Sequence, residues 1–278
     1  MDFSLVIAIS TMGGLGFLFA GALAIADKKL RVYEDPKIGQ VNELLPGANC
    51  GACGNAGCYD FAVKVVAGQI TPGDCPVADT DAASEIAKIL GLEPDGGTRM
   101  VARVLCRGGK AEASRKEDAL YRGPKSCSTT ILIAGGDKLC LDGCVGGGEC
   151  VEACQFGAMY MNENELPVVI EEFCTGCGLC AKACPRNIIE MHPADREIFI
   201  FCKNHDDPKT SRKVCAAACI GCQICARKSD GGIIMKDNLA IIDYTKIDIS
   251  KIPFAKCSTK AIDTIHLRVE VEQPELIN

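Results

Sequence analysis

The sequence has 278 residues, a formal net charge of −6 at pH 7, and 20 cysteines but no tryptophan. A chain of this length can form several small domains or one substantial core. Its acidic balance disfavours a nucleic-acid partner, because affinity for a phosphate backbone comes from positive charge. So many thiols indicate either a disulfide scaffold in an oxidising compartment or metal sites in a reducing one.

The chain begins with an uncharged apolar segment, residues 3–26. At about 1.5 Å per residue, it predicts a helix of about 36 Å, enough to cross the roughly 30 Å hydrocarbon layer of a membrane. A cleaved signal peptide is the alternative, but only Asp2 precedes the segment and no basic residue does. Because Lys28 and Lys29 follow it, we expect residues 1–27 to be an uncleaved anchor. The rest of the chain is then expected on the cytoplasmic side of the inner (cytoplasmic) membrane.

A small cysteine-rich domain is predicted over residues 32–92. Cys50, Cys53 and Cys58 lie in a loop rich in glycine and asparagine, and Cys75 follows a short predicted helix. Small residues let the backbone wrap closely around a cluster and donate N–H groups to its sulfurs. We expect these four cysteines to bind one 4Fe–4S cluster, with a structural zinc site as the alternative. The stretch resembles the four-iron domain of corrinoid iron–sulfur proteins.

Further elements follow in chain order. Residues 59–68 and residues 79–92 each predict an amphipathic helix, and the Gly- and Pro-containing residues 93–98 predict a domain boundary. Residues 93–134 are interpreted as a connector that contains one strand. That strand, "MVARVLC", ends at Cys106.

Residues 135–193 predict a two-cluster ferredoxin domain. The run "CTGCGLCAKACP" has the cysteine spacing of bacterial ferredoxins, which favours iron–sulfur over zinc, and residues 140–154 hold a stretched version of it. Residues 158–173, between the two runs, predict a hairpin. In such domains the fourth cysteine of each run ligates the other cluster. The expected ligand sets are Cys140, Cys144, Cys150 and Cys184 for one cluster, and Cys154, Cys174, Cys177 and Cys180 for the other.

Residues 194–265 predict a second ferredoxin-like unit that has lost one of its two clusters. Cys219, Cys222 and Cys225 keep the run, but Ser229 stands where its fourth cysteine is expected. A second hairpin is predicted after this run, and the run that should follow the hairpin is degenerate. The unit is therefore expected to bind one cluster.

Cys257 is the expected fourth ligand of that cluster, together with Cys219, Cys222 and Cys225. When the repeat is laid over residues 247–257, Cys257 takes the last ligand position, which the crossed scheme assigns to the preceding cluster. Cys215 is the competing ligand, because it lies shortly before Cys219.

Four cysteines remain outside these sets: Cys106, Cys127, Cys202 and Cys215. Cys106 and Cys202 each end an apolar strand, and one further cysteine follows each strand before the next run, which predicts a duplicated structural element. Buried free thiols are the expected use of these residues, with extra ligation as the alternative. The sequence thus predicts four 4Fe–4S clusters held by sixteen cysteines.

From residue 3 to residue 262, the order of anchor, four-iron domain and ferredoxin units resembles the B subunit of the Rnf electron-transport complex. The resemblance implies a membrane complex that moves electrons between reduced ferredoxin and NAD, coupled to translocation of Na+ or H+. It also implies that this chain accepts electrons from soluble ferredoxin and passes them to the other membrane and peripheral subunits. Many relatives carry two clusters in the last unit, and this chain departs from them.

The expected fold is α+β: one N-terminal transmembrane helix, a small four-iron domain, tandem ferredoxin-like units with short strands and helices, and a tail at residues 266–278. No strand–Gly-x-Gly-x-x-Gly–helix pattern is found, so NAD and flavin chemistry is expected in other subunits. Two other functions are open to such a sequence. One is a stand-alone membrane-anchored polyferredoxin that serves another dehydrogenase, and the other is a zinc-stapled membrane scaffold.

Overall fold

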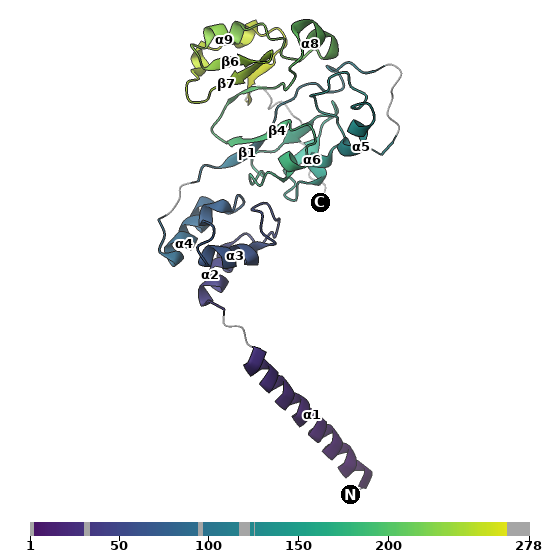
Figure 1. Ribbon diagram of the computed structural model, residues 1–278, viewed down its shortest axis with the longest axis vertical. Helices are drawn as coiled ribbons and strands as arrows, with labels where there is room; N and C mark the ends of the chain where they lie inside the picture. Colours follow the sequence, from purple (N-terminus) through teal and green to yellow (C-terminus); the bar gives the residue numbers. More distant parts are fainter. Residues whose placement is uncertain (1–2, 31–33, 94–96, 117–122, 125, 266–278) are drawn as a thin grey trace.

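The computed structural model describes residues 3–30, 34–93, 97–116, 123–124 and 126–265. The predicted tail and the first two residues of the predicted anchor lie outside this range. Helix α1 (Phe3–Leu30) projects away from the rest of the chain as a single straight rod (Figure 1). Within it, Ile9–Leu30 is long and apolar enough to cross a membrane. The predicted N-terminal helix is therefore confirmed.

Three helices form the small domain after α1. They are α2 (Pro36–Leu44), α3 (Cys58–Val66) and α4 (Thr80–Leu90), joined between α3 and α4 by the 3-10 turn η1 (Pro72–Asp74). The Asp79 side chain accepts a hydrogen bond from Ala82 N–H and caps α4, while Gly91, at φ 72°, ends it. Helices α3 and α4 were predicted, whereas α2 was not.

The core of the small domain joins one apolar face from each of the three helices. Val41 of α2, Phe61 and Val65 of α3, and Ile86 of α4 are almost fully buried and pack together. Burying such side chains stabilises a fold by about 1.5–3 kcal/mol each. This core holds the start of α3, and with it Cys58, against the rest of the domain.

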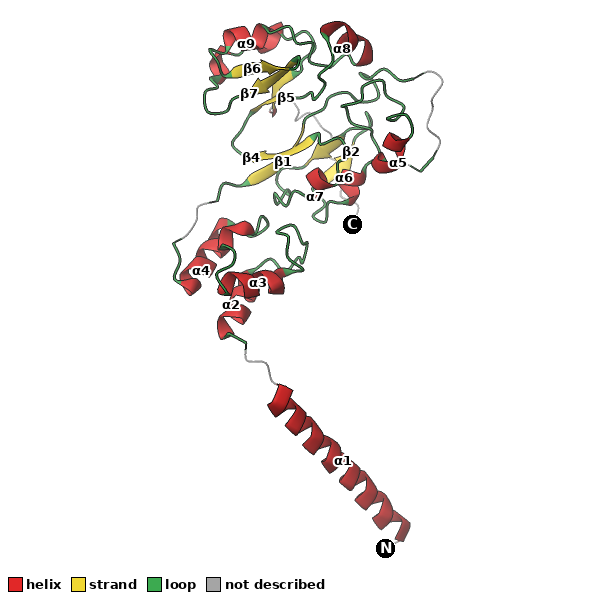
Figure 2. Ribbon diagram, viewed as in Figure 1, coloured by secondary structure: helices red, strands yellow, loops and turns green. Residues whose placement is uncertain are grey.

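Residues 100–193 form the first of two strand-bearing units (Figure 2). Its elements are β1 (Met100–Val104), α5 (Cys127–Leu132), α6 (Glu149–Glu152), β2 (Met159–Met161), β3 (Pro167–Val169), α7 (Leu179–Lys182) and β4 (Ile189–Pro193). Strands β2 and β3 form the predicted antiparallel hairpin, and β1 pairs antiparallel with β4, from Met100 opposite Pro193 to Val104 opposite Ile189. The strand of the predicted connector thus belongs to the sheet of this unit.

Residues 198–264 form the second unit with the same order of strands. Its elements are β5 (Ile198–Ile200), α8 (Pro208–Val214), α9 (Ile224–Lys228), β6 (Ile233–Lys236), β7 (Leu239–Ile242), η2 (Ile249–Lys251), η3 (Phe254–Lys256) and β8 (Ile262–Thr264). The outer strands β5 and β8 pair, and so do β6 and β7. Asp237 and Asn238, at φ 45° and 64°, close the predicted hairpin as a type I′ turn.

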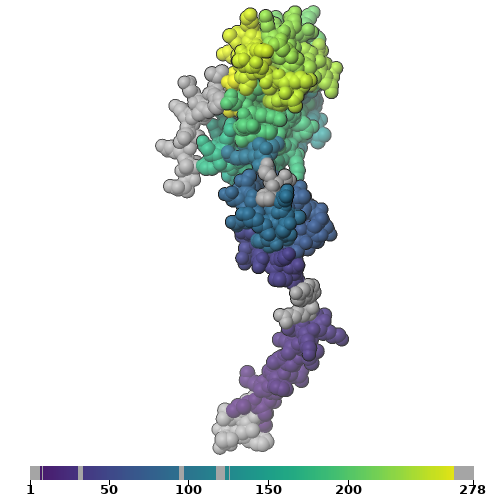
Figure 3. All heavy atoms as spheres, turned by 90° about the vertical axis from the view of Figure 1, so that its left-hand side faces the viewer, coloured from purple at the N-terminus to yellow at the C-terminus, as the bar shows by residue number. Residues whose placement is uncertain are grey.

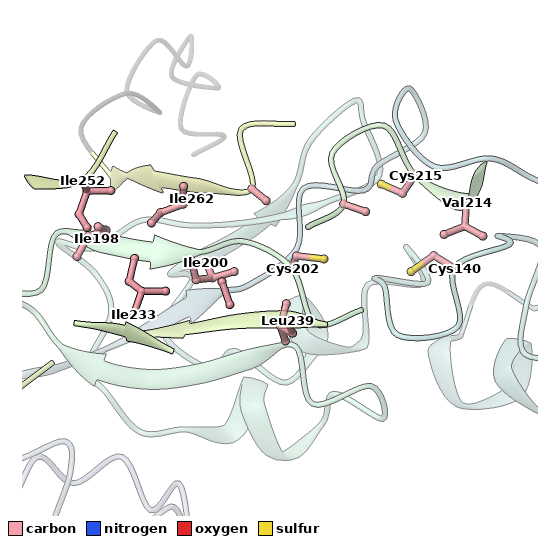
Figure 4. Packing of buried hydrophobic residues seen from close by; sticks show 13 residues of the cluster. Cys140, Ile198, Ile200, Cys202, Val214, Cys215, Ile233, Leu239, Ile252 and Ile262 are labelled. Atoms are coloured by element: carbon pink, nitrogen blue, oxygen red, sulfur yellow. The ribbon is translucent and has the colours of Figure 1, made fainter. Parts of the chain in front are cut away.

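The largest apolar core lies in the second unit and reaches the first. Ile198, Ile233, Leu239 and Ile262 pack in its interior, and cysteines gather at one end of it (Figure 4). In the view of Figure 3, the small domain, the first unit and the second unit follow one another along the long axis.

Candidate metal centres

Cysteine thiols border four pockets, and all 20 cysteines are free of disulfides. The four groups are Cys50, Cys53, Cys58 and Cys75; Cys127, Cys144, Cys150 and Cys184; Cys154, Cys174, Cys177 and Cys180; and Cys219, Cys222, Cys225 and Cys257. In the part of the chain that the structure describes, no three His, Cys, Asp or Glu side chains converge on the point that a single metal ion would occupy. The thiols instead surround small spaces.

The first pocket lies in the small domain, where the loop before α3 brings three cysteines to the residue that follows η1. Cys58 N–H donates a hydrogen bond of 2.8 Å to Asn49 Oδ1, and Asn55 Nδ2 donates one of 3.4 Å to Cys53 Sγ. Burial raises the pKa of the Cys75 thiol, although backbone N–H groups that hydrogen-bond to it oppose that rise. Amide donors of this kind favour a thiolate, which is the form that binds metal.

The next two pockets exchange cysteines between the two runs of the first unit. Cys154, which ends the first run, borders the pocket of Cys174, Cys177 and Cys180, whereas Cys184, which ends the second run, borders the other pocket. Helices α6 and α7 hold the third cysteine of each run in the same way, since each helix follows a glycine in the left-handed region. The crossed arrangement matches the pattern of a two-cluster ferredoxin.

One predicted member of these groups is replaced in the structure. Cys140 does not border the pocket of Cys144, Cys150 and Cys184, and Cys127 borders it instead. A Cβ on Gly147 would lie 3.0 Å from Cys127 Sγ and 2.5 Å from the Cys127 backbone nitrogen. The start of α5 therefore occupies the space that a cysteine side chain at position 147 would need.

The sequence holds a signal for this arrangement that was missed. Cys144, Cys150 and Cys154 keep the intervals of Cys174, Cys180 and Cys184, and in that register the second cysteine position of the first run is Gly147. Cys140 then lies before the run rather than in it. Which distant thiol fills the gap could not be inferred from spacing, because Cys127 reaches the pocket only through tertiary packing.

The fourth pocket lies in the second unit and has the membership that was predicted. Cys219, Cys222 and Cys225 share it with Cys257, which follows η3, and Cys215 does not border it. Among the cysteines, which all lie in the described residues, Cys222 is the most exposed to solvent.

The place of the missing second run is filled by packing. Ser229 is buried, and its Oγ accepts a 2.8 Å hydrogen bond from Ile233 N–H and donates one of 3.0 Å to Ala226 O. A Cβ on Gly232 would lie 2.8 Å from Cα of Ile247, which occupies the first degenerate ligand position. Ser229 and Ile247 thus take up, by hydrogen bonding and packing, two positions at which a second cluster would need thiols.

Burial sets the protonation of several of these thiols when no metal is bound. It raises the pKa of Cys144 and of Cys150 to about 12, and that of Cys180 and of Cys225 to about 11. The metal-free thiols are therefore protonated at neutral pH, so metal binding must release protons from them. Deprotonating these buried thiols costs free energy, and the binding of a positive metal centre must offset that cost.

Two family models match parts of the chain. Residues 45–77 match the FeS model of an Fe-S cluster, and residues 143–189 match a 4Fe-4S dicluster domain. The first match contains the pocket of the small domain. The second begins after Cys140 and contains both runs of the first unit. Iron–sulfur clusters are thus the metal centres that these parts of the chain support.

Curated relatives match most of the chain, and each is the B subunit of a multi-subunit complex. The chain is 37% identical to that of the Na(+)-translocating ferredoxin:NAD(+) oxidoreductase complex of Acetobacterium woodii, over 87% of this chain and 73% of the relative. It is 36% identical to that of the ion-translocating oxidoreductase complex of Methanosarcina acetivorans, over 95% of this chain and 99% of the relative. It is 32% identical to that of the proton-translocating ferredoxin:NAD(+) oxidoreductase complex of Clostridium ljungdahlii, over 97% of this chain and 96% of the relative.

Proposed function

The chain belongs to the family of B subunits of ion-translocating Rnf oxidoreductase complexes, and from this premise we propose that it takes electrons from reduced ferredoxin. It is an iron–sulfur electron-transfer subunit of that family. Bound 4Fe–4S clusters supply one-electron oxidation and reduction. The residues of this chain hold the clusters, set their surroundings and present one of them to a partner.

The proposed ligands are the four thiol groups that border pockets. In the first unit, Cys127 takes the ligand role that was predicted for Cys140. The other three groups consist of the predicted cysteines. The exchange of Cys154 and Cys184 between the two runs carries the proposal, because it is the ligand pattern of two-cluster ferredoxins. The matching strand order of the two units supports a tandem ferredoxin-like arrangement, with one cluster lost from the second.

The pocket of Cys222 is the proposed docking point for ferredoxin. Cys222 is the most exposed cysteine, and four exposed basic residues lie near the pocket in the sequence: Arg227, Lys228, Lys256 and Lys260. Arg227 also donates a 3.2 Å hydrogen bond to Cys222 O, which holds its charge at the rim. A cluster of about +2 bound by four thiolates is anionic, so a ferredoxin carries negative charge that this rim attracts.

The membrane helix and the other subunits complete the proposal. Helix α1 anchors the chain in the cytoplasmic membrane. The clusters lie on the cytoplasmic side, because the positive charges of Lys28 and Lys29 retain the C-terminal end of the helix there. The other membrane and peripheral subunits receive the electrons and carry out NAD reduction and ion translocation. The proposal covers either ion, since relatives are named for sodium and for proton translocation.

Tagged full-length chain purified anaerobically from its own membranes tests this function. Multispanning and flavin-bearing subunits are expected to copurify, and intact mass should show an N-terminus before residue 27. Reduced ferredoxin should bleach the absorbance near 400 nm in a rapid-mixing experiment. A chain that is reduced but copurifies alone would instead be a stand-alone polyferredoxin, and an iron-free, zinc-loaded chain would be a scaffold.

Charge reversal tests the docking point. Arg227→Glu combined with Lys256→Glu should raise the KM for ferredoxin at least several-fold at low salt and leave the limiting rate and the iron content unchanged. Lys88→Glu, on the exposed face of α4 in the small domain, is the matched control. An equal effect of both variants would remove the docking point from the proposal while leaving the electron-transfer role in place.

A further inference from the structure

Four cysteines belong to none of the four pockets, and the structure brings them together. They are Cys106, Cys140, Cys202 and Cys215, each between 6% and 9% exposed. Cys106 follows β1, Cys140 precedes the first run, Cys202 follows β5, and Cys215 follows α8. They come in equivalent pairs from the two units: Cys106 and Cys202 each follow the first strand of a unit, and Cys140 and Cys215 each lie four residues before the first cysteine of a run.

Three of these sulfurs lie close to one or both of two glycines, Gly108 and Gly143. A Cβ on Gly108 would lie 3.0 Å from Cys215 Sγ and 3.8 Å from Cys106 Sγ. A Cβ on Gly143 would lie 3.3 Å from Cys140 Sγ and 3.8 Å from Cys106 Sγ. Cys106 is therefore near both of the other thiols, and the sulfurs approach the two glycines so closely that neither position has room for a side chain.

Figure 4 shows that Cys202 completes the group. The sulfurs of Cys140, Cys202 and Cys215 point from three separate segments into one shared space. All three side chains lie in the same apolar cluster, together with Val214. These thiols converge at the end of an apolar core without forming a disulfide. In this respect the group resembles the thiol groups of the four pockets.

Each of the four sulfurs also faces backbone donors. Cys144 N–H donates a 3.3 Å hydrogen bond to Cys106 Sγ, and Asn204 N–H donates one of 3.4 Å to Cys202 Sγ. Backbone N–H groups also face the thiols of Cys140 and Cys215 and oppose the rise in pKa that burial causes. A buried thiol needs no such donors, whereas a cluster-bound thiolate is stabilised by them.

We propose that Cys106, Cys140, Cys202 and Cys215 bind a fifth 4Fe–4S cluster between the two units. The inference rests on the proposed function, because it takes the neighbouring thiol groups as cluster sites. It replaces the predicted total of four clusters by five and gives all 20 cysteines a ligand role. It also explains why Cys140 does not border the pocket of Cys144, Cys150 and Cys184, since its thiol belongs to this group.

The position of the group joins the two units. The amide that bonds to Cys106 Sγ is that of Cys144, a member of the pocket in the first unit. The backbone N–H of Cys219, a member of the pocket in the second unit, faces the Cys202 thiol and opposes the rise in its pKa that burial causes. A cluster bound here would thus contact, through Cys106 and Cys202, the backbone of one residue of each neighbouring site, and it would lie between the Cys222 pocket and the first unit.

Anaerobic analysis of the full-length chain tests the inference. We expect about twenty iron and twenty sulfide per chain, at four of each per cluster, and less than one zinc. The double substitution Cys140→Ser with Cys215→Ser should remove about a fifth of both. Val214→Ala, which changes packing beside Cys215 but no thiol, is the matched control and should keep the wild-type content.

Gly108→Ala is a second variant that leaves every thiol in place, and it should also lower iron and sulfide by up to a fifth because its Cβ enters the space beside two sulfurs. In the fully reduced wild type, the EPR spectrum should show magnetic coupling between neighbouring clusters that decreases in the double variant.

A wild-type content near sixteen, or a stoichiometric zinc, would overturn the inference even if the variants failed to fold. So would a double variant with unchanged iron. Because ferredoxin would still reduce a chain with sixteen irons, this failure is distinguishable from failure of the proposed function, in which the iron-loaded chain is not reduced at all.

Discussion

Cys127 Sγ lies 3.0 Å from the point that a Cβ of Gly147 would occupy. Cys127 thus brings a thiol to the place where the first cysteine run has Gly147 in place of a cysteine. Each residue depends on the other, since a side chain at position 147 would overlap the backbone of Cys127, and a smaller residue at position 127 would leave the pocket one thiol short. The two residues are a matched pair in the first unit.

The contrast between Cys127 and Cys140 follows from this pair. Cys127→Ala should reduce the cluster of Cys144, Cys150 and Cys184 to a three-iron form or remove it. Cys140→Ala should leave that cluster intact. EPR of the two variants, compared signal by signal, checks the assignment. If Cys140→Ala removed the signal of this cluster and Cys127→Ala kept it, Cys140 rather than Cys127 would be its fourth ligand.

Gly147→Ala should also damage this cluster, although it removes no thiol. The added Cβ would lie 2.5 Å from the Cys127 backbone nitrogen, so the start of α5 must move and carry its thiol away. We expect a loss of up to four iron per chain, measured together with sulfide. Gly39→Ala in α2, where a Cβ would meet no atom within 4 Å, is the control and should keep the full content. Equal iron in both variants would contradict the close approach.

Much of this arrangement could be predicted from local patterns. The runs around Cys53, Cys177 and Cys222 grouped their own cysteines because a few residues of chain connect them. The hairpins were also predictable, since the Asp237–Asn238 turn is a local signal. The β1–β4 and β5–β8 pairs, by contrast, join residues far apart in the sequence. They bring Cys106 and Cys202 to the shared space between the units, so no spacing rule could place those residues.

The second unit should not regain a cluster when one cysteine is restored. Ser229→Cys should leave iron and sulfide unchanged, because Ile247, Ser250 and Pro253 stand at the three degenerate ligand positions and supply no thiol. Ser229→Ala should lower stability by about 1–3 kcal/mol, since it leaves the buried Ile233 N–H without the acceptor that it has at 2.8 Å. Iron analysis and thermal unfolding check the two variants. An added cluster signal in Ser229→Cys would show that the lost site is still open.

The last cluster distinguishes Cys257 from Cys215. Cys257→Ala should remove or convert the cluster of Cys219, Cys222 and Cys225, because Cys257 borders that pocket. Cys215→Ala should leave this cluster in place and act on the site between the units. Ferredoxin-dependent bleaching should slow strongly in the first variant, whereas in the second it should remain fast in its initial phase. The reverse pattern would make Cys215 the ligand.

The most direct test of electron uptake by this chain is rapid-freeze EPR of the whole membrane complex after mixing with reduced ferredoxin. We expect that the cluster signals lost in Cys257→Ala appear first, before any flavin radical of the partner subunits, and that Arg227→Glu with Lys256→Glu delays them. If flavin radicals formed first while the clusters of this chain stayed oxidised, electrons would enter the complex elsewhere, and the central claim would be contradicted.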